Sequence, residues 1–285
     1  MLPVRCGVMR RTGLTLVALA LLAACGSGSG AALDENALVI VVSSDLAVGR
    51  HRVAVGAVDQ ANESVVLPTA SVTFEFFRPD GTPAGGTDAA FIWAIPDVRG
   101  LWVANFDFDI AGGWQLGVRD EDGILVVSPP FNVALETSAI DIGDPAPPSE
   151  SKTLEDGALA EITTDPEPDP AFYEMTVAEA VGSGHPSVIV FATPAFCVSA
   201  TCGPSLEVTK DLAADFPNVN FVHVEVFDNL DASTRDELVP AGPIIDWGLQ
   251  TEPWIYVVDR AGIVQARFEG AVGADELRTA VDAVN

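Results

Sequence analysis

Apolar and polar residues alternate over most of residues 36–136, as expected for strands that bury one face. Trp102, Ala104 and Phe106 fall on one side of an extended chain, whereas Asn105 falls on the other. Runs of this kind are separated by turn-forming residues, namely Pro79-Asp80-Gly81, Gly85-Gly86, Gly112-Gly113 and Asp122-Gly123. The spacing predicts a small antiparallel, all-β sandwich over residues 36–136.

From residue 173 the pattern changes to alternating helical and extended segments. The apolar runs predict strands over residues 187–192, 218–226, 254–258 and 263–268, and helices over residues 176–181, 204–214 and 275–284. The order is strand, helix, strand, crossover, β-hairpin and final helix. We therefore expect an α/β domain with a central mixed sheet over residues 173–285.

Residues 137–172 follow neither pattern. Two acidic, proline-rich segments, residues 144–148 and 165–170, exclude a helix or a central strand there, because proline lacks the N–H that both require. We expect this stretch to be an extended, mobile linker between the two domains.

The N-terminus has the features of an export signal. Arg5, Arg10 and Arg11 precede an apolar run, residues 14–24, that is too short to span a bilayer as a helix. Residues 1–24 are therefore predicted to be a cleaved secretory signal peptide.

The end of this signal, Leu22-Ala23-Ala24-Cys25, resembles the bacterial lipobox. The resemblance implies that Cys25 is acylated and becomes the new N-terminus, followed by a Gly/Ser-rich tether that ends at residue 35. The protein would then be exported and lipid-anchored, on the outer face of the cell membrane or the periplasmic face of a bacterial membrane. The alternative is an ordinary cleaved signal in which Cys25 has no role.

The chain is strongly acidic, with 14 Lys and Arg against 41 Asp and Glu and a net charge of −27. Removal of residues 1–24 takes away three arginines and no acids, which leaves 11 basic residues and a charge of −30. Such a surface repels nucleic acid and anionic lipid headgroups, so we expect no nucleic-acid partner. An adaptation for solubility or salt accounts for this acidity better than an acidic binding face does.

Glycines precede two tryptophans of the predicted sandwich, in Gly100-Leu101-Trp102 and Gly112-Gly113-Trp114. This pattern resembles the YtkA-like group of exported immunoglobulin-like domains. The domain contains one histidine, His51, and no Met or Cys, so it offers no metal-binding cluster. We interpret it as an interaction or spacer module.

Four cysteines occur in the chain. Cys6 would leave with the signal peptide and Cys25 would carry the lipid. Cys197 and Cys202 then remain, and in an oxidising compartment they form either a disulfide or a reversible dithiol.

The surroundings of this pair resemble the thioredoxin fold, in particular its TlpA-like and Sco-like members. The resemblance rests on the run from Phe191 to Cys197, on Cys202-Gly203-Pro204, on Thr251-Glu252-Pro253-Trp254, and on the turn Asp259-Arg260-Ala261-Gly262. It implies that Pro253 forms a cis peptide bond beside the cysteines. It also implies that Glu252 and Trp254 lie near the sulfurs and contact the substrate.

The resemblance further implies a thiol–disulfide oxidoreductase that uses no cofactor and acts on protein thiols and disulfides. One thiolate attacks a sulfur of the partner and the second cysteine resolves the mixed disulfide. Four residues separate the cysteines here instead of the usual two, so two alignments stay open. Either Cys197 attacks, which we favour because it precedes a polar loop, or Cys202 attacks from the helix start and Ser205 takes the resolving position.

Thioredoxins keep a buried acid on the strand before the redox motif, and residues 188–191 contain none. Glu225 and Asp228 follow the next strand and are candidate substitutes. We nevertheless expect both to be ordinary surface acids.

Other interpretations of the pair are a structural disulfide in a non-catalytic binding lipoprotein, and a Sco-like copper chaperone. Copper would need a third soft ligand, but the loop over residues 246–253 has no histidine, His185 is in another loop, and His223 is expected in the core or at a sheet edge. We therefore expect no metal site. Trp247, Leu249 and Trp254 would either line a substrate groove or pack in the core.

Overall fold

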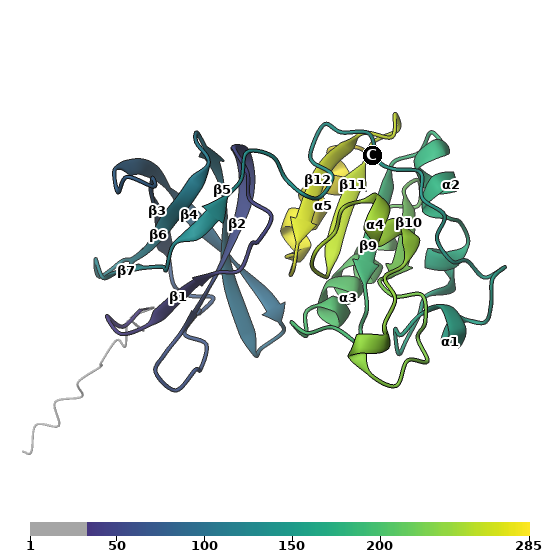
Figure 1. The fold of residues 1–285 in the computed structure, drawn as a ribbon, viewed down its shortest axis with the longest axis horizontal. Helices are drawn as coiled ribbons and strands as arrows, with labels where there is room; N and C mark the ends of the chain where they lie inside the picture. Colours follow the sequence, from purple (N-terminus) through teal and green to yellow (C-terminus); the bar gives the residue numbers. More distant parts are fainter. Residues whose placement is uncertain (1–32) are drawn as a thin grey trace, which may run out of the picture. The chain divides into compact units, whose positions relative to one another are not determined.

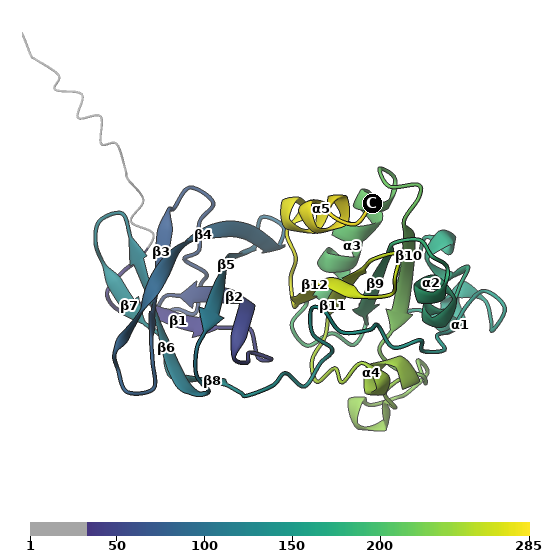
Figure 2. The same cartoon turned by 90° about the horizontal axis from the view of Figure 1, so that it is seen from above.

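A computed structural model describes residues 33–285 of the chain (Figures 1 and 2). The predicted signal peptide, Cys25 and most of the tether lie outside the described residues. Within residues 33–285, no helix is both long enough and apolar enough to cross a bilayer.

The N-terminal region is all-β, as predicted. Its strands are β1 (Leu38–Val41), β2 (Gly49–Val58), β3 (Val72–Phe77), β4 (Pro83–Ile95), β5 (Arg99–Phe108), β6 (Gly112–Asp120), β7 (Leu125–Val127) and β8 (Phe131–Val133). All pairs are antiparallel, in the order β1-β2-β5-β4-β3-β6-β7, with β8 also paired to β6. Because β1 also lies against β6 and β7, the sheet wraps into a barrel-like sandwich.

Aromatic rings fill the inside of this sandwich. Phe108 makes edge-to-face contacts with Phe76, Trp114 and Phe131, at ring-centroid distances of 5.7, 5.0 and 6.1 Å. Trp102 is also fully buried, so the face predicted from period-two alternation is the core face.

The outer face of the sandwich is also partly covered, which the alternation does not predict. Leu101 and Val103 of β5 are buried with Ile92 and Ala94 of β4, and Ala271 from the C-terminal region packs against them. β5 is therefore buried on both faces.

The C-terminal region is the predicted α/β domain with a mixed sheet. Its strands are β9 (Ser187–Ala192), β10 (Asn220–Glu225), β11 (Trp254–Val258) and β12 (Val264–Glu269), in the order β10-β9-β11-β12. β10 is parallel to β9, whereas β11 is antiparallel to both β9 and β12. This strand order is that of the thioredoxin-like fold.

Helices cover both faces of this sheet (Figure 2). Leu206 of α3 (Cys202–Ala213) and Leu277 of α5 (Ala274–Asp282) pack on one face, in the same cluster as Cys202. On the other face lie α2 (Val177–Gly182) and α4 (Gly242–Asp246), which pack against the second apolar cluster. α2 begins where the sequence predicts, because Thr176 caps it: the Thr176 hydroxyl accepts the Glu179 N–H at 3.1 Å.

The expectation of a mobile linker is wrong for most of residues 137–172. The backbone of this stretch bonds to the C-terminal region at several points, including Ile140 N–H to Trp247 O at 3.2 Å and Ala146 N–H to Gly262 O at 2.9 Å. It also forms α1 (Leu159–Ile162) and the 3-10 helix η1 (Pro170–Tyr173). Proline excludes regular strands and long helices but does not prevent packing, and Phe172 is 2% exposed.

Candidate redox site and its surroundings

Cys197 and Cys202 form a disulfide, with their Cα atoms 6.0 Å apart. Cys197 lies in the loop that follows β9, and Cys202 is the first residue of α3. All six residues of β9 are buried, so the loop starts from a fixed point in the core.

The two sulfurs differ in exposure. Cys202 is fully buried, whereas Cys197 is half-buried. The Cys202 N–H donates to Cys197 Sγ at 3.3 Å, and Ser199 Oγ lies 3.3 Å from the same sulfur. Cys197 is therefore the more accessible of the two cysteines, and hydrogen bonding from the first amide of a helix favours a thiolate there.

The peptide bond between Glu252 and Pro253 is cis, and Pro253 directly precedes β11. The loop before β11 is connected to the redox loop by Arg235. The Arg235 guanidinium pairs with the Glu252 carboxylate at 3.2 Å and also donates to the carbonyl of Phe196, the residue before Cys197. Arg235 gives no local signal in the sequence, because it lies in the crossover segment, 39 and 17 residues from Phe196 and Glu252.

Trp254 has its side chain in the core. It is 2% exposed and packs with Tyr256 and Trp247 on the sheet face opposite the one that holds Cys202. Leu249 belongs to the same cluster. Trp247, Leu249 and Trp254 therefore pack in the core and do not line a groove beside the cysteines. Alternation along β11 places the Trp254 side chain on the face away from the cysteines.

The expectation that Glu225 is a surface acid is wrong. Glu225 ends β10 beside Ala192 and is 6% exposed. Its Oε2 accepts the N–H of Thr164 at 2.8 Å and the Thr164 hydroxyl at 2.9 Å. Thr164 Oγ1 in turn accepts the N–H of Ala195 at 3.2 Å, two residues before Cys197. Asp228 is exposed, as expected.

His223 and Tyr173 extend this polar network. The Tyr173 hydroxyl lies 2.6 Å from His223 Nδ1 and 3.0 Å from Thr163 Oγ1, and His223 Nε2 lies 3.0 Å from the carbonyl oxygen of Ala192. Burial lowers the pKa of His223 and raises the pKa of Tyr173, because both charged forms lose their hydration. At neutral pH both groups are therefore uncharged.

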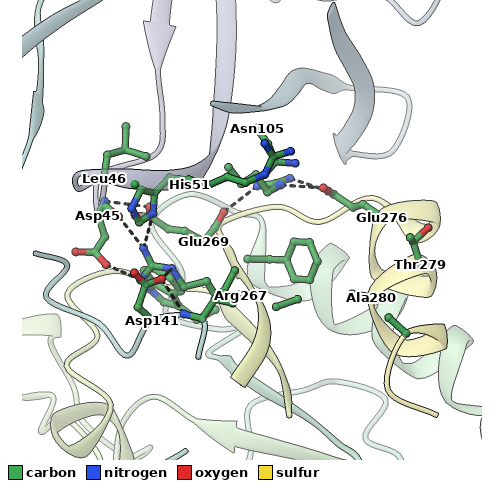
Figure 3. Close-up of a pocket in the computed structure, with 18 of the residues that line it drawn as sticks. Asp45, Leu46, His51, Asn105, Asp141, Arg267, Glu269, Glu276, Thr279 and Ala280 are labelled. Carbon is green, nitrogen blue, oxygen red and sulfur yellow. Dashed lines mark hydrogen bonds and ion pairs between the residues drawn. The ribbon is translucent and has the colours of Figure 1, made fainter. Parts of the chain in front are cut away.

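A cluster of ion pairs joins the sandwich to the C-terminal region, and Figure 3 shows its members. Arg267 of β12 pairs with Asp45 at 2.9 Å and with Asp141 at 3.1 Å, and it approaches His51 Nδ1 at 3.1 Å. Nearby, Arg52 pairs with Glu276 at 2.7 Å. The described residues of both regions belong to one compact unit.

Burial and the Arg267 charge both lower the pKa of His51. Because Arg267 can only donate, His51 Nδ1 must accept, which requires the neutral ring. His51 is thus held uncharged beside a cation.

No group of three or more His, Cys, Asp or Glu side chains within residues 33–285 is arranged to hold a metal ion. His223 is bound to Tyr173 and Ala192, and His185 is on the surface.

No family model and no curated protein matches the chain. Among solved structures, a candidate thiol:disulfide interchange protein DsbE from Chlorobium tepidum is 18% identical, with a TM-score of 0.35, over 51% of this chain and 99% of that one. A thioredoxin family protein from Chlorobium tepidum TLS, also named a thiol:disulfide interchange protein, is 20% identical, with a TM-score of 0.32 and the same coverage. The Lin-41 filamin domain is 14% identical, with a TM-score of 0.24, over 35% of this chain and 93% of that one. The strand order, the cysteine pair between β9 and α3, and the cis-proline before β11 define the fold of the C-terminal region.

Proposed function

We propose that this protein is a thiol–disulfide oxidoreductase in which Cys197 is the attacking residue and Cys202 the resolving one. One observation carries the proposal: the half-buried Cys197 sulfur accepts the first N–H of α3, while Cys202 is fully buried behind it. A purely structural disulfide needs neither an accessible sulfur nor an amide directed at it.

In the reducing direction, the Cys197 thiolate attacks one sulfur of a partner disulfide. A Cys197–partner bond forms, the partner disulfide breaks, and the released partner sulfur takes up a proton. The Cys202 thiolate then attacks Cys197 Sγ and releases the second partner thiol. The partner gains two electrons and the protein ends with the Cys197–Cys202 disulfide; the reverse sequence oxidises a partner dithiol.

We further propose that the protein acts outside the cytoplasm, held at a membrane by a lipid on Cys25. The lipobox-like sequence supports the anchor, and an oxidising compartment agrees with the disulfide. A Cys25→Ser variant should lose metabolic labelling by a fatty acid and partition into the aqueous phase after detergent extraction. Unchanged labelling would contradict the anchor without affecting the redox proposal.

The redox proposal is tested with paired cysteine variants. Cys202→Ser should accumulate a mixed disulfide with a partner through Cys197, because resolution is lost, whereas Cys197→Ser should trap far less. Insulin reduction by dithiothreitol should be accelerated by the native protein and by neither variant.

The alternative function is binding through both domains with an inert disulfide. It predicts that the disulfide resists low-millimolar dithiothreitol and that no variant traps a partner. The reduction potential of the couple separates the cases, since structural disulfides lie below about −300 mV.

A further inference from the structure

A pocket of about 250 Å³ lies directly beside the redox loop, and the sandwich forms one of its walls. The C-terminal region contributes Ser199 and Thr201, between the two cysteines, and Glu252, just before the cis-proline. The sandwich contributes Ala94 of β4 and Leu101 of β5. The pocket is therefore built by both regions.

The pocket reaches the attackable sulfur through one side chain. Ser199 Oγ lies 3.3 Å from Cys197 Sγ and 2.7 Å from Thr201 Oγ1. A partner residue next to a sulfur that bonds to Cys197 would therefore lie at the mouth of this pocket.

Four of the six sandwich residues that line the pocket are apolar, namely Val42, Ala54, Ala94 and Leu101. Leu101 and Ala94 are 6% and 1% exposed and belong to the apolar cluster completed by Ala271. Such a surface favours an apolar side chain of the partner over a charged one.

The two carboxylates that line the pocket both have partners. The Glu252 carboxylate is paired with Arg235. The Glu269 carboxylate accepts from the hydroxyl and N–H of Ser44, and from Thr251 Oγ1 at 3.0 Å.

Arg99, on the sandwich side of the pocket, has no such partner within residues 33–285. It is exposed and lines the pocket, yet it makes no ion pair and no side-chain hydrogen bond within the described part of the chain. In a chain of net charge −27, an unpaired cation next to the redox site attracts an anionic group of the partner.

We propose that this pocket selects the polypeptide partner of Cys197, and that the sandwich is thereby a specificity element of the redox site. The preferred partner is an extended segment with an apolar residue next to its cysteine, which enters the pocket, and an acidic residue beside it, which pairs with Arg99. This inference rests on the proposed redox function.

The test compares two disulfide-linked peptides that are identical except for one position. Both carry Leu next to Cys, followed by either Glu or Lys, and 4,4′-dithiodipyridine serves as an uncharged small disulfide that does not need the pocket. Initial rates are measured with the reduced full-length protein and with Arg99→Ala, Arg99→Glu and Val42→Trp. Arg50→Ala is the matched control, because Arg50 is an exposed sandwich arginine that does not line this pocket.

The native protein should reduce the Glu peptide about fivefold faster than the Lys peptide, as expected for an exposed ion pair. Arg99→Ala should remove this preference and Arg99→Glu should reverse it, whereas Arg50→Ala should keep it. Val42 is an exposed residue that lines the pocket, so Val42→Trp should obstruct it and slow both peptides severalfold. No variant should change the rate with dithiodipyridine by more than about twofold, because none alters the cysteines.

An unchanged peptide preference in Arg99→Glu, with normal dithiodipyridine reduction, would overturn this inference and leave the redox proposal intact. Failure of the native protein to reduce dithiodipyridine would overturn both.

Discussion

The sandwich and the α/β region each bury a carboxylate, and the two carboxylates bind backbone at different distances along the chain. Asp120 of the sandwich is 7% exposed, and its Oδ1 accepts the N–H of Ile124 at 2.9 Å, which closes the turn between β6 and β7. Glu225 is 6% exposed and binds Thr164, which itself holds the backbone of the redox loop through Ala195. One buried acid shapes a local turn, whereas the other joins segments about 60 and 30 residues away in the chain.

The other buried polar side chains differ in the same way. In the sandwich they make separate backbone contacts: Ser43 Oγ accepts the Ala54 N–H at 2.9 Å, and Ser128 Oγ accepts the Leu116 N–H at 3.1 Å. In the α/β region, Tyr173, His223 and Glu225 lie on the sheet face that also carries Cys202. Buried polar groups are costly unless they are bonded, and here Glu225 Oε2 is connected through Thr164 to the loop that carries Cys197, whereas Glu225 Oε1 has no hydrogen-bond partner within residues 33–285.

The largest expected effect concerns the connection between the two regions. Arg267→Met removes a 7% exposed cation and leaves Asp45 and Asp141 without their partner. Breaking a buried ion pair in this way costs about 3–5 kcal/mol. Urea denaturation followed by tryptophan fluorescence should show this loss, and it should show the regions unfolding in separate steps.

Arg50→Met is the control, since its pair with Asp107 is exposed at 67% and 73%. It should change the free energy of unfolding by less than about 0.5 kcal/mol. Equal effects of the two variants would mean that the Arg267 cluster does not hold the regions together.

The second prediction separates the two buried acids. Glu225→Ala and Asp120→Ala should each destabilise the fold by about 1–3 kcal/mol, because each leaves a partly buried N–H donor without its acceptor. Only Glu225→Ala should also change the rate of disulfide exchange, since only Glu225 is connected to the redox loop. A comparable rate change in Asp120→Ala would contradict this distinction.

The third prediction concerns two buried tyrosines within the α/β region. Tyr173→Phe loses the hydrogen bonds to His223 and Thr163 and should cost about 0.5–1.5 kcal/mol. The Tyr256 hydroxyl is buried on the other sheet face without a hydrogen-bond partner within residues 33–285. Tyr256→Phe should therefore be neutral or stabilising in thermal unfolding, and a loss as large as that of Tyr173→Phe would refute the assignment.

The smallest expected effect is a pH dependence. The folded state lowers the pKa of His51 and of His223, so below pH 6.5 the unfolded chain binds more protons than the folded one. The free energy of unfolding is therefore highest above this pH and decreases as the pH falls below it. Each histidine should contribute up to about 0.7 kcal/mol of this loss between pH 7 and pH 6.

Denaturation curves of the native protein and of histidine variants at both pH values test this. His51→Gln and His223→Gln should each flatten the dependence, whereas His185→Gln, at the surface, should leave it unchanged. A dependence unaffected by either buried histidine would contradict the neutral state inferred for both.

Much of the candidate site was predictable because its signals are local. The run from Phe191 to Cys197, the helix that begins at Cys202 and the position of Pro253 are all encoded by residues close in the chain. Arg235 gave no such signal, because its two contacts, with Phe196 and Glu252, are 39 and 17 residues away.

Local signals in the sequence encode the two kinds of element, their order, and the cysteine pair at a strand-to-helix junction, because periodicity, capping and turn chemistry act over a few residues. Tertiary structure decided which side chains meet. It buried Glu225 beside Ala192, packed the proline-rich segment against the α/β region, and covered the outer face of β5 at Leu101. Burial depends on neighbours far away in the chain, and a local pattern of polar and apolar residues does not specify them.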